Sequence, residues 1–120
     1  MAIVLTQAGE EYIVDKLDET IAATLPDDVG SGTGAGTAAK ADTALFTEVT
    51  EARAVATLSQ PAADKLRAVA TQTYTGAKTI TNAGNLTAPT AGTLVIHGDF
   101  AGVVVAANDK IEFTIDLEIT

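Results

Sequence analysis

The sequence predicts a mainly β domain, an antiparallel β-sandwich or barrel-like fold with one N-terminal α-helix. Residues 110–119 alternate strictly between polar and apolar side chains, which is the period of a strand with one buried face. Other short segments rich in Val, Ile, Thr and Ala recur at spacings of about ten residues, as in sandwiches and barrels. Helical patterns do not alternate with these segments, which argues against a parallel sheet.

The final strand is the core strand around which we arrange the other segments. Its apolar side chains are Ile111, Phe113, Ile115, Leu117 and Ile119. On a helical period these side chains would scatter around the cylinder, whereas on a strand they form one β-branched and aromatic row. We therefore expect this strand to lie in the core, with earlier segments completing its sheet.

The length of 120 residues leaves room for a single domain, residues 1–120. Much of the 47% hydrophobic content is alanine, aromatic residues make up only 4% and tryptophan is absent, so we expect a thin core. A thin core predicts modest stability for the monomer, which self-association or docking on a larger scaffold would supplement. The absence of cysteine excludes disulfides and thiolate nucleophiles.

The formal net charge is −9, and the lysines and arginines are scattered singly. This charge disfavours nucleic-acid phosphates and anionic membranes, so we expect neither as a partner. Residues 1–5 run directly into Thr6 and Gln7, without the basic region or long apolar run of a signal peptide or membrane span. We expect a soluble protein, made in the cytoplasm and kept there or in an assembly formed there.

Residues 6–23 predict the one helix. Thr6 can cap it, and Glu10 places negative charge in its first turns. Apolar side chains recur at four-residue spacing at Ile13, Leu17 and Ile21. Gly9 lowers helix stability by about 1 kcal/mol relative to alanine, and the threonines at the far end favour an early stop.

The glycine-rich residues 30–36 predict a flexible or edge-strand loop. Residues 30–35 formally match the glycine pattern of dinucleotide-binding loops. That pattern requires a hydrophobic strand before it and a helix directly after it, whereas Asp27 and Asp28 precede this run and a further glycine follows. We therefore predict a loop and no nucleotide site.

Residues 42–49 leave two alternatives open. Asp42 can cap a short turn, and Leu45, Phe46 and Val49 share a helical face. This pattern predicts either about two turns of helix or an irregular segment with Leu45 and Phe46 inserted into the core.

The remaining strands are predicted within residues 53–120. Residues 53–60 and 65–74 form a hairpin whose turn, 61–64, begins with Pro61. Further strands are predicted at 79–84, 93–98, 103–105 and 110–120, separated by a loop with Pro89 and Gly92 and by a turn at 106–109.

Few residues carry catalytic chemistry. His97 is the only histidine, and Asp99, two residues along the same strand face, permits a His–Asp contact. Neither serine, Ser31 or Ser59, has the context of an activated nucleophile. We interpret His97 as a strand-end residue that faces solvent or a subunit contact, and we predict no catalytic residue and no cofactor.

The carboxylates do not form a calcium-binding loop pattern, and the adjacent pair Asp27 and Asp28 would point to opposite faces of a strand. We therefore predict solvated surface charge and no metal ligand. A Ca²⁺ ion held at a subunit contact is the alternative.

Five motifs occur in a characteristic order: L-T-Q-A-G at residues 5–9, V-G-S-G-T-G at 29–34, D-T-A-L-F-T-E-V at 42–49, I-T-N-A-G at 80–84 and the ending from Gly92 to Ile115. In this order they resemble small structural proteins of tailed bacteriophages, and they are similar to N-terminal domains of phage tail-collar and tail-fibre proteins. Ser31 and residues 85–86 depart from the aromatic residues expected in such relatives. The resemblance implies a non-enzymatic virion component present in many symmetric copies.

The expected function is therefore that of a capsid cement or decoration protein, which assembles with its own copies and docks on a major capsid protein. A neck, collar or tail-fibre adaptor of the same virion is the alternative. A net charge of −9 would be repelled by packed DNA, so the outer surface of the head, or the neck and tail, is favoured. A glycan-binding tip would need more aromatic side chains than this chain has.

Exposed loops and strand edges are the expected contacts in assembly. The candidates lie in the N-terminal arm, the glycine run and two proline loops: Ile3, Leu5, Gly30, Gly32, Gly34, Gly36, Pro61 and Pro89.

Overall fold

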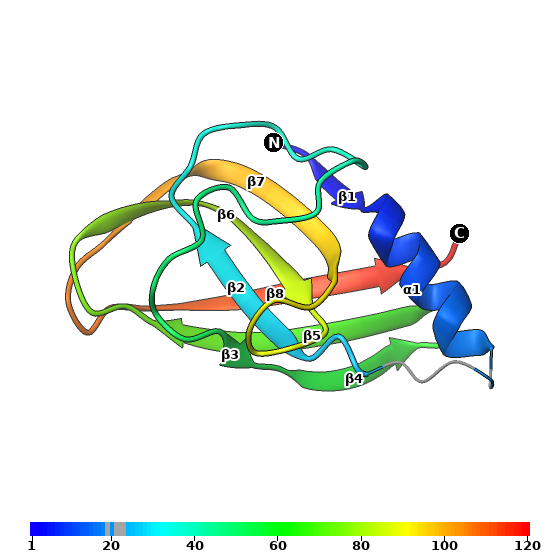
Figure 1. The fold of residues 1–120 in the computed structure, drawn as a ribbon. Coiled ribbons are helices and arrows are strands. Elements are labelled where there is room, and N and C mark those ends of the chain that lie inside the picture. Colours follow the sequence, from blue (N-terminus) through cyan, green and yellow to red (C-terminus); the bar gives the residue numbers. More distant parts are fainter. Residues whose placement is uncertain (19, 21–23) are drawn as a thin grey trace.

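A computed structural model describes residues 1–18, 20 and 24–120. Strands account for 48% of these described residues and helix for 9%. One helix and two antiparallel sheets form an elongated body of 44 × 26 × 26 Å (Figure 1). The predicted fold class, an antiparallel sandwich with one N-terminal helix, is confirmed.

The larger sheet has the strand order β1-β7-β6-β2-β3 and the smaller sheet the order β4-β5-β8. The elements are β1 (Ile3–Leu5), α1 (Gln7–Leu17), β2 (Asp28–Gly32), β3 (Ala54–Val55), β4 (Thr57–Ala62), β5 (Lys65–Thr73), β6 (Lys78–Leu86), β7 (Leu94–Val105) and β8 (Lys110–Glu118). The chain crosses from one sheet to the other at Ala56, whose N–H donates to the Asp27 carbonyl over 2.7 Å. The predicted hairpin is present as β4 and β5, but its turn is only residues 63–64, and Pro61 lies in β4. Residues 54–55 of the predicted first strand form β3, in the other sheet.

The core between the sheets is built from small side chains. Its buried members are Val29, Ala56, Ala68, Ala70, Tyr74, Ile80, Ala83, Val105 and Phe113. Four of these nine residues are alanine, so each contributes little buried apolar area. The larger side chains of Leu58, Phe100, Ile111 and Ile115 pack at the margin of this cluster and are only partly buried.

Helix α1 begins where the sequence predicts. The Thr6 hydroxyl accepts from the Gly9 N–H over 2.9 Å and donates to the Leu94 carbonyl over 2.6 Å, which ties the cap to β7. Gly9 is required by packing, because a Cβ there would lie 2.3 Å from the Val95 carbonyl oxygen. The helix ends at Leu17, and Asp18 has extended backbone angles. Glu19 and residues 21–23 of the predicted helix lie outside the described residues.

The first part of the glycine-rich run is a strand and not the predicted loop. Residues 28–32 form β2, which is buried along its whole length between β6 and β3. Gly30 and Gly32 therefore lie inside a sheet, and only Gly34 and Gly36 belong to the irregular segment that follows. The loop prediction assumed that glycine weakens a strand, which holds for ordinary strands. Glycine is nevertheless favoured in a strand where another segment approaches its backbone closely, and this explains why the prediction was wrong.

The approaching segment is residues 33–50, which crosses the outer face of the larger sheet. A Cβ at Gly32 would lie 2.1 Å from the Phe46 carbonyl oxygen, and one at Gly30 would lie 3.0 Å from Leu45 Cδ1. Leu45 is buried with Leu86 and Leu94 on this face. Residues 42–49 form no helix, so the irregular alternative is correct for this segment.

The last two strands differ from their predicted forms. β7 is continuous from Leu94 to Val105, so the predicted break between residues 98 and 103 is absent. In place of a break, the pairing of β7 with β6 shifts register between Ile80 and Asn82. In β8 the odd-numbered side chains face inward as predicted, but only Phe113 is buried. Ile119 lies beyond the strand and is 63% exposed, because β8 is an edge strand whose end extends past the core.

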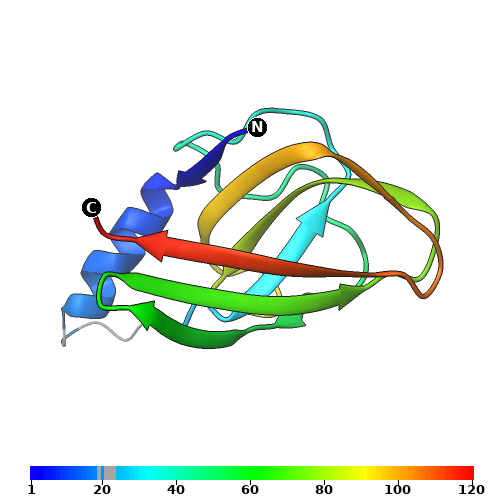
Figure 2. The ribbon, with the colours of Figure 1, turned by 180° about the vertical axis from the view of Figure 1, so that it is seen from behind.

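β7 and β8 leave the turn at residues 106–109 together but enter different sheets, and they diverge from that turn towards α1 (Figure 2). We call the space between β8 on one side and β1 and β7 on the other the seam. The opposite side of the sandwich is closed by the short connection from β3 to β4.

Replacing Gly32 with alanine is expected to destabilise the fold by about 1–3 kcal/mol, because the new methyl group collides with backbone that has no room to move. Urea unfolding measures the change. Gly76→Ala is the matched control, since a Cβ at Gly76 has no atom within 4 Å. Equal unfolding midpoints for the two variants would contradict the close approach.

Candidate functional site

The predicted contact residues separate into exposed and buried groups. Ile3 is 67% exposed on the edge strand β1, and Leu5 is half-buried. Pro61 and Pro89 are exposed, in β4 and in the β6–β7 loop, and Gly36 is also exposed. Gly30 and Gly32 are buried beneath residues 33–50, so the expectation that they offer contacts from an exposed loop is wrong.

His97 is fully buried, and the prediction that it faces solvent or a subunit is wrong. Its Nδ1 lies 2.7 Å from Asp42 Oδ2, and its Nε2 lies 3.0 Å from Asn82 Oδ1. The ring of Phe46 meets the imidazole edge-on, with centroids 4.6 Å apart. The segment 33–50 thus covers the histidine and supplies its charged partner.

The backbone of Phe46 fixes the orientation of Asn82. The Phe46 N–H donates to Asn82 Oδ1, and Asn82 Nδ2 donates to the Phe46 carbonyl, each over 3.0 Å. Because Asn82 Oδ1 accepts, His97 Nε2 must carry a hydrogen and donate to it. Nδ1 is in hydrogen-bond contact with the Asp42 carboxylate, so neither ring nitrogen is free for a substrate.

Asp99, the sequence-expected partner of His97, has a different role. Its Oδ1 accepts from the Ala38 N–H over 2.8 Å and from the Ala2 N–H over 3.1 Å. Hydrogen bonding from Ala38, followed by that from Ala2, lowers the pKa of Asp99. The carboxylate therefore holds both the N-terminal arm and residues 33–50 against β7.

A second buried polar cluster joins the two sheets. Ser31 of β2 donates to Gln72 Oε1 over 2.5 Å and lies 2.8 Å from the Tyr74 hydroxyl. Gln72 Nε2 donates to the Ala52 carbonyl over 3.1 Å. Burial raises the pKa of Tyr74, so the phenol stays protonated and available as a donor. Ser31 is a link between sheets, which its place in a glycine run did not reveal.

Among the described residues, Glu51 and Lys78 form the most buried ion pair between a carboxylate and a lysine or arginine, with side chains 3% and 20% exposed. Glu51 also accepts from the Thr75 N–H over 2.9 Å. The hydrogen bond from Lys78 is the largest of the causes that lower the pKa of Glu51 from 4.5 to about 2. This pair fastens the segment before β3 to the start of β6.

Sequence spacing could not identify these clusters, because the partners of His97 lie 15 and 55 residues away, Ser31 is 41 residues from Gln72, and Glu51 is 27 residues from Lys78. Within residues 1–18, 20 and 24–120, no three His, Asp or Glu side chains group in a way that could hold a metal ion. In the same residues, no helix is long and apolar enough to cross a membrane.

The hollows of the surface are mainly apolar. One, of about 220 Å³, lies between α1 and the smaller sheet and is lined by side chains such as Ile13, Leu17, Leu58, Leu66 and Leu117. A second, of about 360 Å³, lies in the seam and is lined by residues including Met1, Ile3, Phe100 and Phe113–Asp116. Such concave apolar surfaces suit the side chains of a protein partner.

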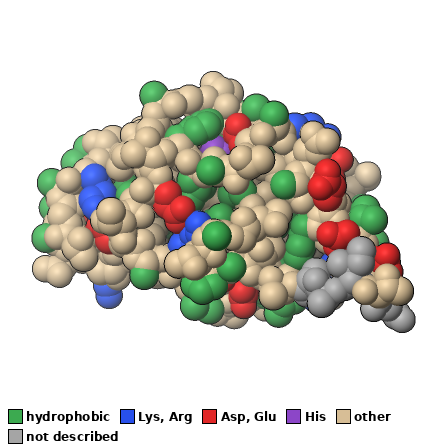
Figure 3. All heavy atoms as spheres, viewed as in Figure 1, with side chains coloured by type: hydrophobic (Ala, Val, Ile, Leu, Met, Phe, Trp, Pro, Cys, Tyr) green, Lys and Arg blue, Asp and Glu red, His purple; other side chains and the backbone are tan. Residues whose placement is uncertain are grey.

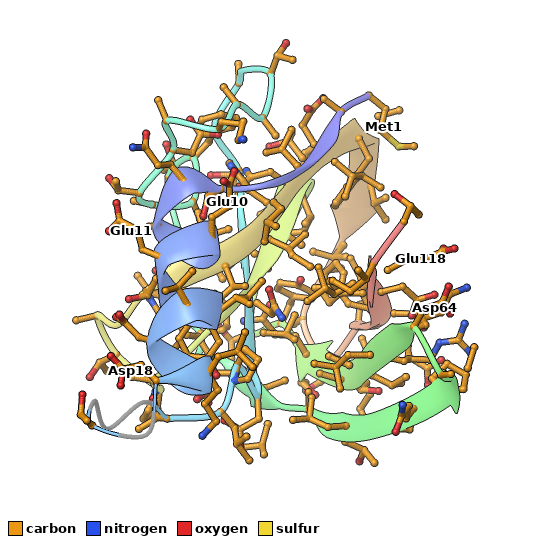
Figure 4. The ribbon with its side chains drawn as sticks, turned by 90° about the vertical axis from the view of Figure 1, so that its right-hand side faces the viewer. Met1, Glu10, Glu11, Asp18, Asp64 and Glu118 are labelled. Carbon is orange, nitrogen blue, oxygen red and sulfur yellow. The ribbon has the colours of Figure 1, made fainter. Side chains whose placement is uncertain are left out.

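Exposed apolar side chains gather where β1, α1 and the C-terminus meet. We call this surface the docking end: Met1, Ile3, Val14, Leu17, Leu25 and Ile119, all exposed. Among the described residues the other exposed large apolar side chains are Val55, Val103 and Val104. Figure 4 views the molecule from this end, and the labelled acids Glu11, Asp18, Asp64 and Glu118 project around it. Acidic and apolar side chains also lie together over α1 at the right of Figure 3.

No protein-family model matches this chain, and a search of curated proteins finds no significant match. The function is therefore inferred from the sequence and the geometry.

Glu51→Gln is expected to change how stability depends on pH. The folded-state pKa of about 2 lies below the ordinary value of 4.5, so the carboxylate's contribution is complete above pH 4.5 and is lost as the pH falls towards 2. Unfolding midpoints of the variant should therefore fall less steeply over this window. Glu112→Gln, at an exposed position of β8, is the control. Parallel pH profiles for E51Q and the unaltered protein would refute the role of this pair.

His97→Ala is expected to destabilise the protein by about 2–4 kcal/mol, because it leaves a cavity and two buried polar partners without hydrogen bonds. Hydrogen exchange should show added opening of residues 33–50, which the ring anchors. If exchange speeds up equally in β5, the histidine supports the fold in general rather than this segment.

Proposed function

We propose that this chain is a non-enzymatic structural protein of a tailed-phage virion that docks on the outer capsid surface as a cement or decoration protein. The order of its sequence motifs supports the virion assignment. The observation that carries docking is the docking end, where most of the exposed large apolar side chains of the described residues gather. Exposed apolar surface rimmed by polar residues is typical of protein–protein contact sites.

The buried polar clusters are consistent with a mechanical role. His97, Ser31 and Glu51 belong to residue types that often serve catalysis, and each is buried in contacts that join segments of this chain. Their hydrogen bonds fix residues 33–50 and the spacing of the two sheets. They therefore act in holding the shape that a docking protein presents.

The receiving surface should be apolar and basic. Leu17 and Ile13 line the 220 Å³ hollow, which has room for an apolar side chain of the partner. Glu11, Asp18, Asp64 and Glu118 project around this end (Figure 4). Lysine or arginine on the receiving protein would complement these carboxylates and speed encounter.

Copy number in purified particles separates the two placements. Quantitative mass spectrometry should find hundreds of copies per particle for a decoration protein. A dozen copies or fewer would instead assign it to the neck, collar or tail. Absence from particles of the phage that encodes it would overturn the virion proposal altogether.

Leu17→Glu is expected to weaken rebinding of purified protein to particles that lack it by at least about tenfold, because a charge replaces an apolar contact at the docking end. Val104→Glu is the matched control, since both side chains are 79% exposed and Val104 lies next to the distant β7–β8 turn. Co-sedimentation with particles measures binding. Equal loss in both variants, or loss in V104E alone, would place the contact elsewhere.

A further inference from the structure

The four edge strands of the two sheets are not equally protected against pairing with another chain. β1 has three residues and β3 has two, which are too short to template much pairing. β4 carries Pro61, and its register with β5 shifts between Ser59 and Ala62. Proline, irregular register and short length are the usual protections of sheet edges.

β8 has none of these protections. It pairs with β5 in one unbroken register over nine residues, from Lys110 to Glu118. It contains no proline, and its inward-facing side chains, from Ile111 to Leu117, are all apolar. Within the part of the chain that the structure describes, β5 is its only partner strand. The backbone groups on the far side of β8 are therefore available for pairing.

Space is open beside this edge. The 360 Å³ hollow of the seam is lined by four consecutive residues of β8, Phe113–Asp116. Because side chains alternate along a strand, a hollow that meets four consecutive residues borders the backbone edge rather than one face. Figure 2 shows β8 diverging from β7 along this side. An added strand would lie here, with its apolar side chains towards Phe100 and Ile3.

β8 is complementary to itself in one antiparallel register. If Phe113 lies opposite Phe113 of a second copy, Ile111 lies opposite Ile115, and their apolar side chains remain on the inward face. On the outward face, Lys110 then lies opposite Asp116, and Glu112 lies opposite Thr114. The Lys110–Asp116 pair, which occurs twice by symmetry, joins opposite charges, and such cross-strand neighbours are stabilising.

The other registers that pair most of β8 bring like charges together or reverse the faces. Centring the pair on Thr114 places Glu112 opposite Asp116, and centring it on Ile115 places Glu112 opposite Glu118. Centring it on Glu112 places that residue opposite itself. Sliding one strand by a single residue relative to the other would turn the apolar side chains of one copy outward.

We propose that two copies of this chain associate through β8, centred on Phe113, so that their smaller sheets join into one six-stranded sheet. The partner is a second copy, because in this register β8 pairs opposite charges with itself and keeps the apolar side chains of both copies on the inward face. This inference builds on the proposed function, since it identifies the contact between copies of the structural protein. The contact is expected to form in the purified protein, in the absence of virus particles. The dimer buries the side chains that the thin core leaves partly exposed along β8.

Cysteine cross-linking tests the register, since the chain has no cysteine of its own. Glu112→Cys and Thr114→Cys are both at exposed, outward positions and should leave the fold intact. Mixed together under mild oxidation, they should form a disulfide-linked heterodimer, because the two positions lie opposite each other. Each variant alone should link no better than Val104→Cys, because equivalent residues then lie about 8 Å apart, beyond disulfide reach.

Charge exchange tests the same contact without a covalent bond. Thr114→Glu should raise the dimer dissociation constant about tenfold, since it places two glutamates opposite each other twice per dimer. Glu112→Lys in the same chain should restore association, whereas Thr57→Glu, on the other edge of the sheet, should leave it unchanged. Sedimentation equilibrium measures all three variants.

An unaltered protein that stays monomeric at millimolar concentration would overturn the proposal, as would a mixture of E112C and T114C that links no better than V104C. Linking of T114C with itself would also overturn it, since that result requires a different register. The outcomes separate this inference from the proposed function. A monomer that binds particles refutes the dimer alone, and a β8 dimer absent from particles refutes the virion role alone.

Discussion

The close approach of residues 33–50 to the larger sheet is the constraint on which the rest of the structure depends. Phe46 lies so near β2 that the backbone beneath it can carry no side chain at Gly32. This contact makes a glycine-rich stretch into a buried strand, because the covering segment supplies the packing that the missing side chains would have provided. It also places Asp42 and the ring of Phe46 over His97.

Polar interactions in this protein join parts of the chain that are distant in sequence. The imidazole of His97 connects β6, β7 and the covering segment, Ser31 connects the two sheets, and Glu51 connects the segment before β3 to β6. Such buried contacts are strong where every member is satisfied, since an unpaired polar group in the interior is costly. Among the described residues, Glu51 Oε1 is the one buried side-chain oxygen or nitrogen without a hydrogen-bond partner. They compensate for a core in which alanine replaces larger side chains.

The larger apolar side chains that do not fill the core lie at its margins and on the surface. Ile111, Ile115 and Leu117 are half-buried along the seam, and the docking end exposes Leu17 and Ile119. A monomer with this distribution leaves much of its potential apolar burial unused. Contact with a larger surface and with a second copy would both complete it. The two contacts use adjoining regions, the docking end and the middle of β8, which share Met1 and Ile3.

The sequence by itself determined the elements whose signals are local. The alternation in residues 110–118 specified the last strand and its inward face, Thr6 specified the start of the helix, and the polar residues before Lys65 indicated a hairpin, although Pro61 itself lies in β4. Local patterns suffice there because period, cap and turn chemistry act within a few residues.

Only the tertiary structure decided what Gly30, Gly32, His97 and Ser31 do. A glycine in a loop and a glycine under a crossing segment look the same in sequence, and the partners of His97 lie 15 and 55 residues away. The tertiary structure also made β8 an edge, because the chain places β7 and β8 in different sheets although a short turn joins them. Contacts between distant segments set these outcomes, and a single sequence carries no local signal of which segments will meet.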